Sequence, residues 1–428
     1  MIEVGLIGLG NVGQGILNII QENQALLTQR VGQPIHIKTI MVRDPKKYNH
    51  IDFGDSKITT QFSDLINDNE IKIIVEVIGG ETPAYDYICQ ALEHGKYVVT
   101  ANKEVVSKHQ KTFFELAKKH QVDIYYEAAV GGGIPIIRSL KVGFSANKIE
   151  SLLGILNGTT NYILTKIEQD SQEFDVTLKE AQELGLAEAD PSMDISGLDA
   201  AHKLVILAAV AFKSNIQVKD VFYEGIENIT LKDMKYAKEL GFAIKLLALA
   251  KHVNGKQLSF KVHPTMIPLS HPLANIHNEM NAAYLKGNAV GEALLSGKGA
   301  GGSPTGSAIV SDIVDIAFDH TQDVNRRNLE PNLKTADLCP FEDTDSAFYI
   351  RLKVNDHHSV LEQLLGVLAK AEISVSKILQ KEIQNNIAEI VIITHPTKEH
   401  QMAQSISELT DIDTVKKCCS VIRVEEQV

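Results

Sequence analysis

Residues 2–20, with the sequence IEVGLIGLGNVGQGILNII, decide the fold of the amino-terminal part of the chain. A mainly apolar run is followed by glycines at positions 8, 10 and 13, and then by apolar residues at helical spacing. This order predicts a buried strand, a glycine turn that lets the backbone approach a pyrophosphate, and a helix whose first N–H groups attract an anion. We therefore expect a nicotinamide dinucleotide, NAD or NADP, to bind at Gly8, Gly10, Asn11, Val12 and Gly13.

Apolar runs and amphipathic stretches alternate after this motif. Runs typical of buried parallel strands occupy residues 35–42, 71–78, 96–100 and 123–127, and helical stretches occupy 85–95 and 104–120. Such alternation predicts an α/β fold with a doubly wound parallel sheet. We place this Rossmann-like nucleotide-binding domain at residues 1–130 and expect a helix at 303–320 to return to it.

The residues after the second strand bear on the choice of coenzyme. Arg43 is followed by Asp44 and, after a proline, by two lysines. An arginine here accommodates the 2′-phosphate of NADP, whereas a carboxylate accepts the ribose 2′-hydroxyl of NAD. The Asp-Pro pair is also an ordinary turn signal. Arg43 is a candidate coenzyme contact, and the preference between NADP and NAD stays open.

The pattern of elements changes after the first domain. Helices lengthen and strands become sparse before residues 260–296, which suggest short strands, so we expect an α+β domain at 131–302 for substrate binding and dimerisation. Residues 321–345 are largely polar and predict a linker. The order βαββαβ then predicts a ferredoxin-like sandwich at 346–428.

The composition limits the classes of partner. The 428 residues carry 42 Lys and Arg against 54 Asp and Glu, a net charge of −12, which argues against nucleic acid or an anionic membrane. The longest apolar run, residues 204–212, is far shorter than the roughly 20 residues that span a bilayer. With no basic leader and only four cysteines, a cytoplasmic protein acting on small molecules is expected.

Two further motifs offer polar groups to a ligand. Lys103, in TANKE (100–104), follows a predicted strand at the sheet edge where ligands collect, although a lysine at a helix start is equally common. The motif LNGTTN (156–161) offers hydroxyls and backbone N–H groups to a carboxylate. An ordinary helix N-cap explains this second motif equally well.

A dense cluster of acids leads to a single lysine. The stretch GLAEADPSMDISGLDAAHK, residues 185–203, places four carboxylates before Lys203. A helix from residue 198 would put Asp199 and Lys203 one turn apart on one face. The alternative without a catalytic role is an ordinary surface ion pair. A lysine that borders a core and lies near carboxylates has a tunable proton affinity, which suits general acid–base chemistry. The same acids could hold the ammonium group of an amino-acid substrate.

Together these motifs resemble the homoserine dehydrogenase family. The resemblance covers residues 2–318 and rests on GLGNVG (8–13), TANKE (100–104), EAAVGGGIP (127–135), LNGTTNYIL (156–164), GLAEADPSMDISGLDAAHK (185–203) and GKGAGGSPT (297–305). It implies an enzyme that reversibly reduces L-aspartate 4-semialdehyde to L-homoserine with NAD(P)H, in threonine, methionine and isoleucine biosynthesis. No aspartate-kinase segment precedes Met1, so the resemblance is to the monofunctional form.

The resemblance also implies roles for individual residues. Lys203 falls on the proton donor and acceptor, and Lys103 on a second lysine near the hydride path. The residues that match substrate-binding positions are Glu188, Asp194, Asp199, Gly158 and Thr159. Gly299 and Gly301 would close over the nicotinamide. Backbone groups in a glycine-rich turn match a monovalent-cation site, usually sodium, at Glu127, Val130, Gly132 and Ile134.

The carboxy-terminal module looks like an ACT domain, which implies regulation by an amino acid such as threonine. Two features depart from the family: Leu186 stands where relatives often have tyrosine, and residues 355–361 lack the Pro and Gly of the usual ACT loop. The family also implies a homodimer or homotetramer. Two alternatives are a related amino-acid or semialdehyde dehydrogenase and a non-catalytic sensor of a dinucleotide and an amino acid.

Overall fold

The computed structural model describes residues 1–321, 333–384 and 386–425. The chain forms two compact units, each assembled from three segments. Unit 1 comprises Met1–Glu150, Ala201–Asp220 and Met280–Ala336, and unit 2 comprises Ser151–Ala200, Val221–Glu279 and Asp337–Val428. Within the described residues, no helix has the length and apolar character needed to cross a membrane.

Unit 1 contains the predicted parallel sheet. Its strands are β1 (Ile2–Ile7), β2 (Ile35–Met41), β3 (Lys57–Thr59), β4 (Ile71–Glu76), β5 (Tyr97–Thr100) and β6 (Ile124–Tyr125). They lie in the order β3-β2-β1-β4-β5-β6, and every pair is parallel. The order reverses beside β1, so the ends of β1 and β4 form the topological switch point at which such sheets bind ligands. The predicted Rossmann-like fold is confirmed.

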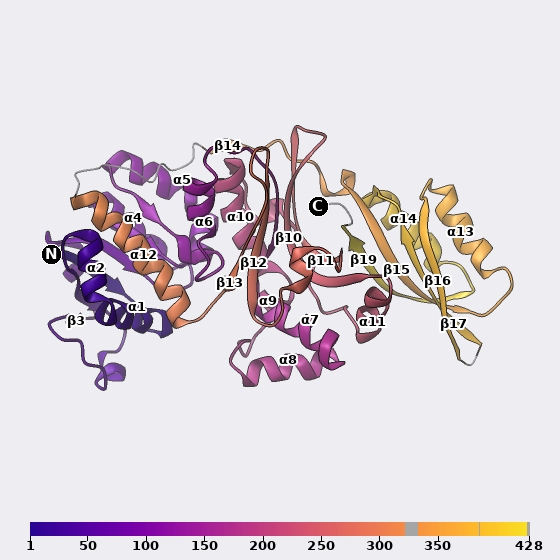
Figure 1. Ribbon diagram of the computed structural model, residues 1–428, viewed down its shortest axis with the longest axis horizontal. Helices are drawn as coiled ribbons and strands as arrows, with labels where there is room; N and C mark the ends of the chain where they lie inside the picture. The colour runs from indigo at the N-terminus through magenta and orange to yellow at the C-terminus, as the bar shows by residue number, and fades with distance from the viewer. Residues whose placement is uncertain (322–332, 385, 426–428) are drawn as a thin grey trace. The chain divides into compact units, whose positions relative to one another are not determined.

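Helices pack against this sheet, and its strands β1, β2, β4 and β5 are mostly buried and apolar. They are α1 (Asn11–Glu22), α2 (Gln24–Val31), α4 (Ala84–Glu93), α5 (Lys103–His120) and α12 (Gly302–Thr321). Figure 1 shows the orange α12 beside the indigo α1, and both contribute to one buried core through residues such as Ile16 and Ile313. The predicted helix at 303–320 therefore does return to the first domain.

Unit 2 contains a mixed sheet that is longer than the sequence predicts. Strand β7 (Ile149–Ile155) pairs with β10 (Phe242–Val253), which pairs over its whole length with β11 (Gln257–Pro268). The prediction of few strands before residue 260 and of short strands after it is wrong here, because β10 and β11 are both long. Alanine, leucine and lysine in β10 favour a helix locally, but hydrogen bonding to strands on both edges overrides that propensity.

The carboxy-terminal part of unit 2 has the predicted order βαββαβ. Its elements are β15 (Asp345–Asn355), α13 (Val360–Lys370), β16 (Val375–Gln384), β17 (Ile387–Thr394), α14 (Glu399–Thr410) and β19 (Val415–Val424). The strands lie antiparallel in the order β19-β15-β17-β16, as in a ferredoxin-like sandwich. Of the predicted linker, residues 322–332 lie outside the described part of the chain.

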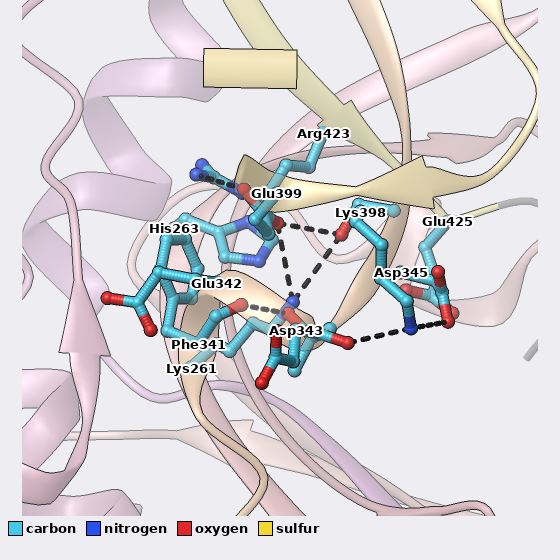
Figure 2. A network of polar contacts seen from close by, with 12 residues as sticks. Lys261, His263, Phe341, Glu342, Asp343, Asp345, Lys398, Glu399, Arg423 and Glu425 are labelled. Atoms are coloured by element: carbon cyan, nitrogen blue, oxygen red, sulfur yellow. Dashed lines mark hydrogen bonds and ion pairs between the residues drawn. The ribbon is translucent and has the colours of Figure 1, made fainter. Parts of the chain in front are cut away.

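A buried polar network joins this module to β11. Strand β19 pairs in parallel with β11 at Thr265, and Figure 2 shows Lys261 and Arg423 both directed at Glu399. Arg423 Nε and Nη2 donate to the two Glu399 oxygens at 2.8 and 3.0 Å, and Lys261 Nζ lies 3.4 Å from Oε1. Arg423 also pairs with Glu224 at 2.7 Å. Glu399, at the start of α14, therefore pairs with one cation from β11 and one from β19.

Candidate active site

The glycine turn has the geometry expected of a dinucleotide-binding loop. Gly8 has φ +99°, and a Cβ atom there would lie 2.8 Å from the Ile78 side chain. A Cβ atom on Gly13 would lie 2.4 Å from the Gly8 carbonyl oxygen, whereas nothing lies within 4 Å of that position on Gly10. The first and third glycines are therefore required by packing, and the second leaves open space for a ligand at the start of α1.

A cavity of about 300 Å³ lies beside this turn. Its lining residues are Gly8, Leu9, Gly10, Met41, Val42, Arg43, Asp44, Lys47, Tyr48, Val77, Ile78, Pro83 and Tyr87. The structure thus brings the glycine turn and Arg43 to one cavity. The Asp44 carboxylate accepts a hydrogen bond from the backbone N–H of Lys46 at 3.1 Å, so it acts as a local cap. Arg43 and Lys47 give the rim a positive charge that suits a phosphate.

Lys103 begins α5 at the carboxyl end of β5, as predicted. Asn102 caps this helix, because its Oδ1 accepts from the N–H of Val105 at 3.2 Å. The Asn102 Nδ2 donates to the carbonyl of Gly80 at 2.7 Å, and its backbone N–H donates to Thr100 Oγ1 at 3.0 Å. Lys103 is therefore the first residue of α5, at the edge of the sheet where such folds bind ligands.

Asn157 links two of the acids in unit 2. Its Nδ2 donates to Asp194 Oδ1 at 2.7 Å and to Asp199 Oδ2 at 2.8 Å. Its Oδ1 accepts from the N–H of Thr160 at 2.8 Å, so Asn157 is also the N-cap of α7 (Gly158–Asp170). The local sequence predicts a cap or a ligand site at this motif, but it does not reveal Asn157 as the link between the acids. A side-chain amide has both donors and an acceptor, which was the available signal.

Of the remaining residues that are predicted to bind substrate, the structure brings some into contact with the acidic motif and leaves one exposed to solvent. Thr159 is buried, and its hydroxyl donates to the carbonyl oxygen of Leu186 at 2.7 Å, which joins the two motifs of unit 2. Gly158 begins α7 beside it. Glu188 is exposed. The contact at Leu186 uses its backbone, so the absence of a tyrosine side chain there does not remove it.

Lys203 lies on α10 (Leu198–Phe212), the helix that the sequence predicts from residue 198. Asp199 is 1% exposed and Lys203 is half-buried. Lys203 follows Asp199 by four positions in the helix, so their side chains leave the same face one turn apart. Residues 204–209 are buried, which confirms that the lysine adjoins a core.

The glycine-rich turn at 131–133 packs against the segment that contains Gly299. A Cβ atom on Gly132 would lie 2.5 Å from the Gly299 carbonyl oxygen, and the N–H of Gly133 donates to the Lys298 carbonyl at 3.1 Å. The carbonyl oxygens of Glu127 and Ile134 each accept one N–H, which leaves a second lone pair for a hard cation. In the described residues no three His, Cys, Asp or Glu side chains form a metal site.

The Glu127 carboxylate is used differently from its carbonyl. It is buried, and it accepts the backbone N–H groups of Ile137 and Arg138 at 2.8 and 2.6 Å. Burial raises the pKa of Glu127 to about 7 even though these hydrogen bonds oppose the shift. Both carboxylate oxygens of Glu127 are therefore taken up by backbone N–H groups at the start of α6 (Ile136–Arg138).

Comparisons with known proteins agree with this geometry. The family model for homoserine dehydrogenase matches residues 135–314, and that for the homoserine dehydrogenase NAD binding domain matches residues 8–127. The homoserine dehydrogenase of Bacillus subtilis is 39% identical over 431 residues, which cover 99% of this chain and 98% of that protein.

Two solved structures extend the comparison. A homoserine dehydrogenase from Thiobacillus denitrificans is similar to this chain with a TM-score of 0.94 and 42% identity, covering 99% of this chain and 98% of that one. A hyperthermophilic archaeal homoserine dehydrogenase in complex with NADPH has a TM-score of 0.62 and 26% identity, covering 75% of this chain and 98% of that one.

Proposed function

Because the chain belongs to the homoserine dehydrogenase family, whose members are NAD(P)-dependent oxidoreductases of amino-acid biosynthesis, we propose that Lys203 is its proton donor and acceptor. The reaction is the reversible reduction of L-aspartate 4-semialdehyde to L-homoserine. The placement of Asp199 and Lys203 on one face of α10 carries the assignment. An ammonium group held beside a carboxylate and a core is suited to exchange a proton with a substrate oxygen.

The chemistry divides between coenzyme and protein. The bound dinucleotide supplies or takes the hydride at the substrate carbon. In the direction of reduction, Lys203 Nζ gives a proton to the aldehyde oxygen as that hydride arrives, which yields the alcohol. In oxidation, the neutral amine takes the hydroxyl proton as the hydride leaves. Lys103, at the sheet edge, is proposed to lie near the hydride path.

The acids of unit 2 are proposed to hold the substrate. Carboxylates of Glu188, Asp194 and Asp199 suit the ammonium group of the amino acid, and the helix start at Gly158 and Thr159 suits its carboxylate. Asn157 supports this assignment, since its two donated hydrogen bonds fix the positions of Asp194 and Asp199. Fixed charges of this kind supply the proximity and orientation that catalysis needs.

The coenzyme assignment rests on unit 1. The cavity beside Gly8 and Gly10 fits a dinucleotide, and Arg43 on its rim favours NADP. The archaeal relative that carries NADPH supports that preference. Gly299 and Gly301 are proposed to close over the nicotinamide. The carbonyl groups at Glu127, Val130, Gly132 and Ile134 are proposed to hold sodium.

The remaining proposals concern regulation, assembly and location. The βαββαβ order supports an ACT assignment for the module at 346–428, with threonine as a candidate effector. The other proposed domains are 1–130 and 131–302, joined to the module through 321–345. We also propose a cytoplasmic homodimer or homotetramer. None of these assignments depends on the catalytic proposal.

Initial rates provide the test. Wild-type protein is assayed with homoserine and either NAD or NADP by the absorbance of the reduced coenzyme, with and without threonine. The proposal expects turnover with homoserine and a lower KM for NADP. No reduction of either coenzyme would refute the proposed reaction, and equal rates with threonine present would refute only the effector.

A further inference from the structure

A fully buried carboxylate lies at the end of β4, and the mechanism above does not use it. Glu76 is 0% exposed. Its Oε1 accepts from the N–H of Ile78 at 2.8 Å, and its Oε2 accepts from Thr100 Oγ1 at 2.7 Å. Burying a carboxylate is costly, so these donors from two loops are what make its position tenable.

The donor Ile78 belongs to the wall of the cavity. Val77 and Ile78 line the 300 Å³ space beside the glycine turn. The Ile78 side chain is the nearest group to the position of a Cβ on Gly8, and the N–H of Val77 donates to the Ile7 carbonyl at 2.9 Å. By accepting the N–H of Ile78, Glu76 determines where this wall stands relative to the glycine turn.

The donor Thr100 connects Glu76 to the start of α5, where Lys103 lies. Thr100 donates to Glu76 and accepts the backbone N–H of Asn102 at 3.0 Å. Asn102 in turn caps α5 and ties it to Gly80, on the loop that Glu76 also holds. Lys103 is the next residue along the chain. One carboxylate therefore fixes both loops at the carboxyl ends of β4 and β5, which is where this fold binds its ligand.

We propose that Glu76 is a positioning residue for the coenzyme. Through Ile78 it sets the wall against which the dinucleotide lies, and through Thr100 it sets the start of α5 and hence Lys103. It is required as an acceptor for both of these donors at once. This inference rests on the dinucleotide site of the proposed function.

The substitution Glu76→Gln tests the link between Glu76 and the cavity wall. Glutamine has the same shape, but one acceptor becomes an NH₂ group that faces donors, so the wall loses part of its support. The dissociation constant for NADPH is measured by the fluorescence of the reduced coenzyme, which is convenient because the chain has no tryptophan. We expect it to rise about tenfold, with the KM for homoserine changed less than twofold.

The chain offers a matched control at the opposite ends of the same strands. Lys96 is also buried, and its Nζ donates to the carbonyls of Asp68 and Ile71 at 2.7 Å each. Lys96→Met should lower the melting temperature without changing the NADPH dissociation constant. If Glu76→Gln lowered only the melting temperature, as Lys96→Met does, Glu76 would be structural and the inference would be wrong.

Thr100→Val separates the link from Glu76 to α5 from the link from Glu76 to the cavity wall. It also provides the test if Glu76→Gln does not fold. It removes the hydroxyl between Glu76 and Asn102 but leaves the contacts of Ile78 intact. We expect kcat to fall severalfold while the NADPH dissociation constant stays within twofold of wild type. An unchanged kcat together with a raised NADPH dissociation constant would overturn the inference. Failure of wild-type protein to bind NADPH would instead overturn the coenzyme assignment itself.

Discussion

The Nδ1 atom of His202 lies 2.7 Å from the Oγ atom of Ser107, and both residues are buried in unit 1. Ser107 Oγ also lies 3.0 Å from the Glu104 carbonyl oxygen, within the first turns of α5. His202 directly precedes Lys203 on α10, and Ser107 follows Lys103 by one turn of α5. This hydrogen bond therefore ties the helix that carries one candidate lysine to the helix that carries the other.

Replacing Ser107 with alanine should disturb both lysines. We expect the free energy of unfolding to fall by about 1 kcal/mol and kcat to fall severalfold, with little change in NADPH affinity. Ser311→Ala is the matched control, because the exposed Ser311 hydroxyl also donates to a carbonyl, that of Ser307 at 2.9 Å. Equal kcat values for the two variants would show that the His202 contact has no catalytic consequence.

Removing the Lys203 ammonium should abolish most of the proton transfer. Lys203→Ala is expected to lower kcat by about 100-fold or more, because general acid–base catalysis contributes about that factor. The dissociation constant for NADPH, measured by fluorescence, should stay near that of wild type. The exposed Lys179 gives a lysine-to-alanine control that should retain full turnover. Unchanged kcat in Lys203→Ala would remove this residue from the mechanism.

The two functions of Asn157 can be separated. Serine is a good N-cap, so Asn157→Ser should keep α7 stable, but serine cannot donate to both Asp194 and Asp199. We expect the KM for homoserine to rise about tenfold, as for a lost charge-assisted hydrogen bond, while the KM for the coenzyme stays constant. Steady-state kinetics with each substrate varied in turn measures both. An unchanged KM for homoserine would confine Asn157 to helix capping.

Arg43 should affect one coenzyme more than the other. Arg43→Ala removes the guanidinium from the rim of the cavity, so the KM for NADP should rise about tenfold or more while the KM for NAD changes little. Lys72→Ala, at an exposed position of β4, controls for the general loss of positive charge. A parallel loss of affinity for both coenzymes would contradict the assignment of Arg43 to the 2′-phosphate.

Lys261 should make stability depend on pH. Burial lowers the pKa of Lys261 from 10.5 to about 8, although Glu399 opposes the shift. Between pH 8 and 10.5 the unfolded chain therefore binds more protons at this residue than the folded chain does, so stability rises with pH through this window. Relative to Lys261→Met, wild type should gain about 3 kcal/mol in the free energy of unfolding across it.

Urea unfolding of both proteins at pH 7.5 and pH 10.5 measures this gain. Lys256→Met, at the exposed turn between β10 and β11, serves as the control and should show no such dependence. A constant difference between wild type and Lys261→Met at the two pH values would mean that Lys261 keeps its ordinary affinity for protons.

Local sequence patterns determined much of this protein. Apolar runs and glycines determined the parallel sheet and the turn at Gly8, the acid-rich approach predicted α10 from residue 198, and periodicity alone indicated the βαββαβ order. These features are encoded within about 20 residues of chain, because strands, helices and turns depend on near neighbours. The candidate residues Arg43, Asp199 and Lys203 could be identified from the sequence for the same reason.

Only the tertiary structure decided which distant residues meet. Strand β10 has a composition that a helix also accepts, and pairing with β7 and β11 made it a strand. Thr100, Asp194 and Ser107, which contact Glu76, Asn157 and His202, lie 24, 37 and 95 residues away from them along the chain. A buried polar side chain must find a partner, but its identity depends on which elements pack together, and no local pattern carries that information.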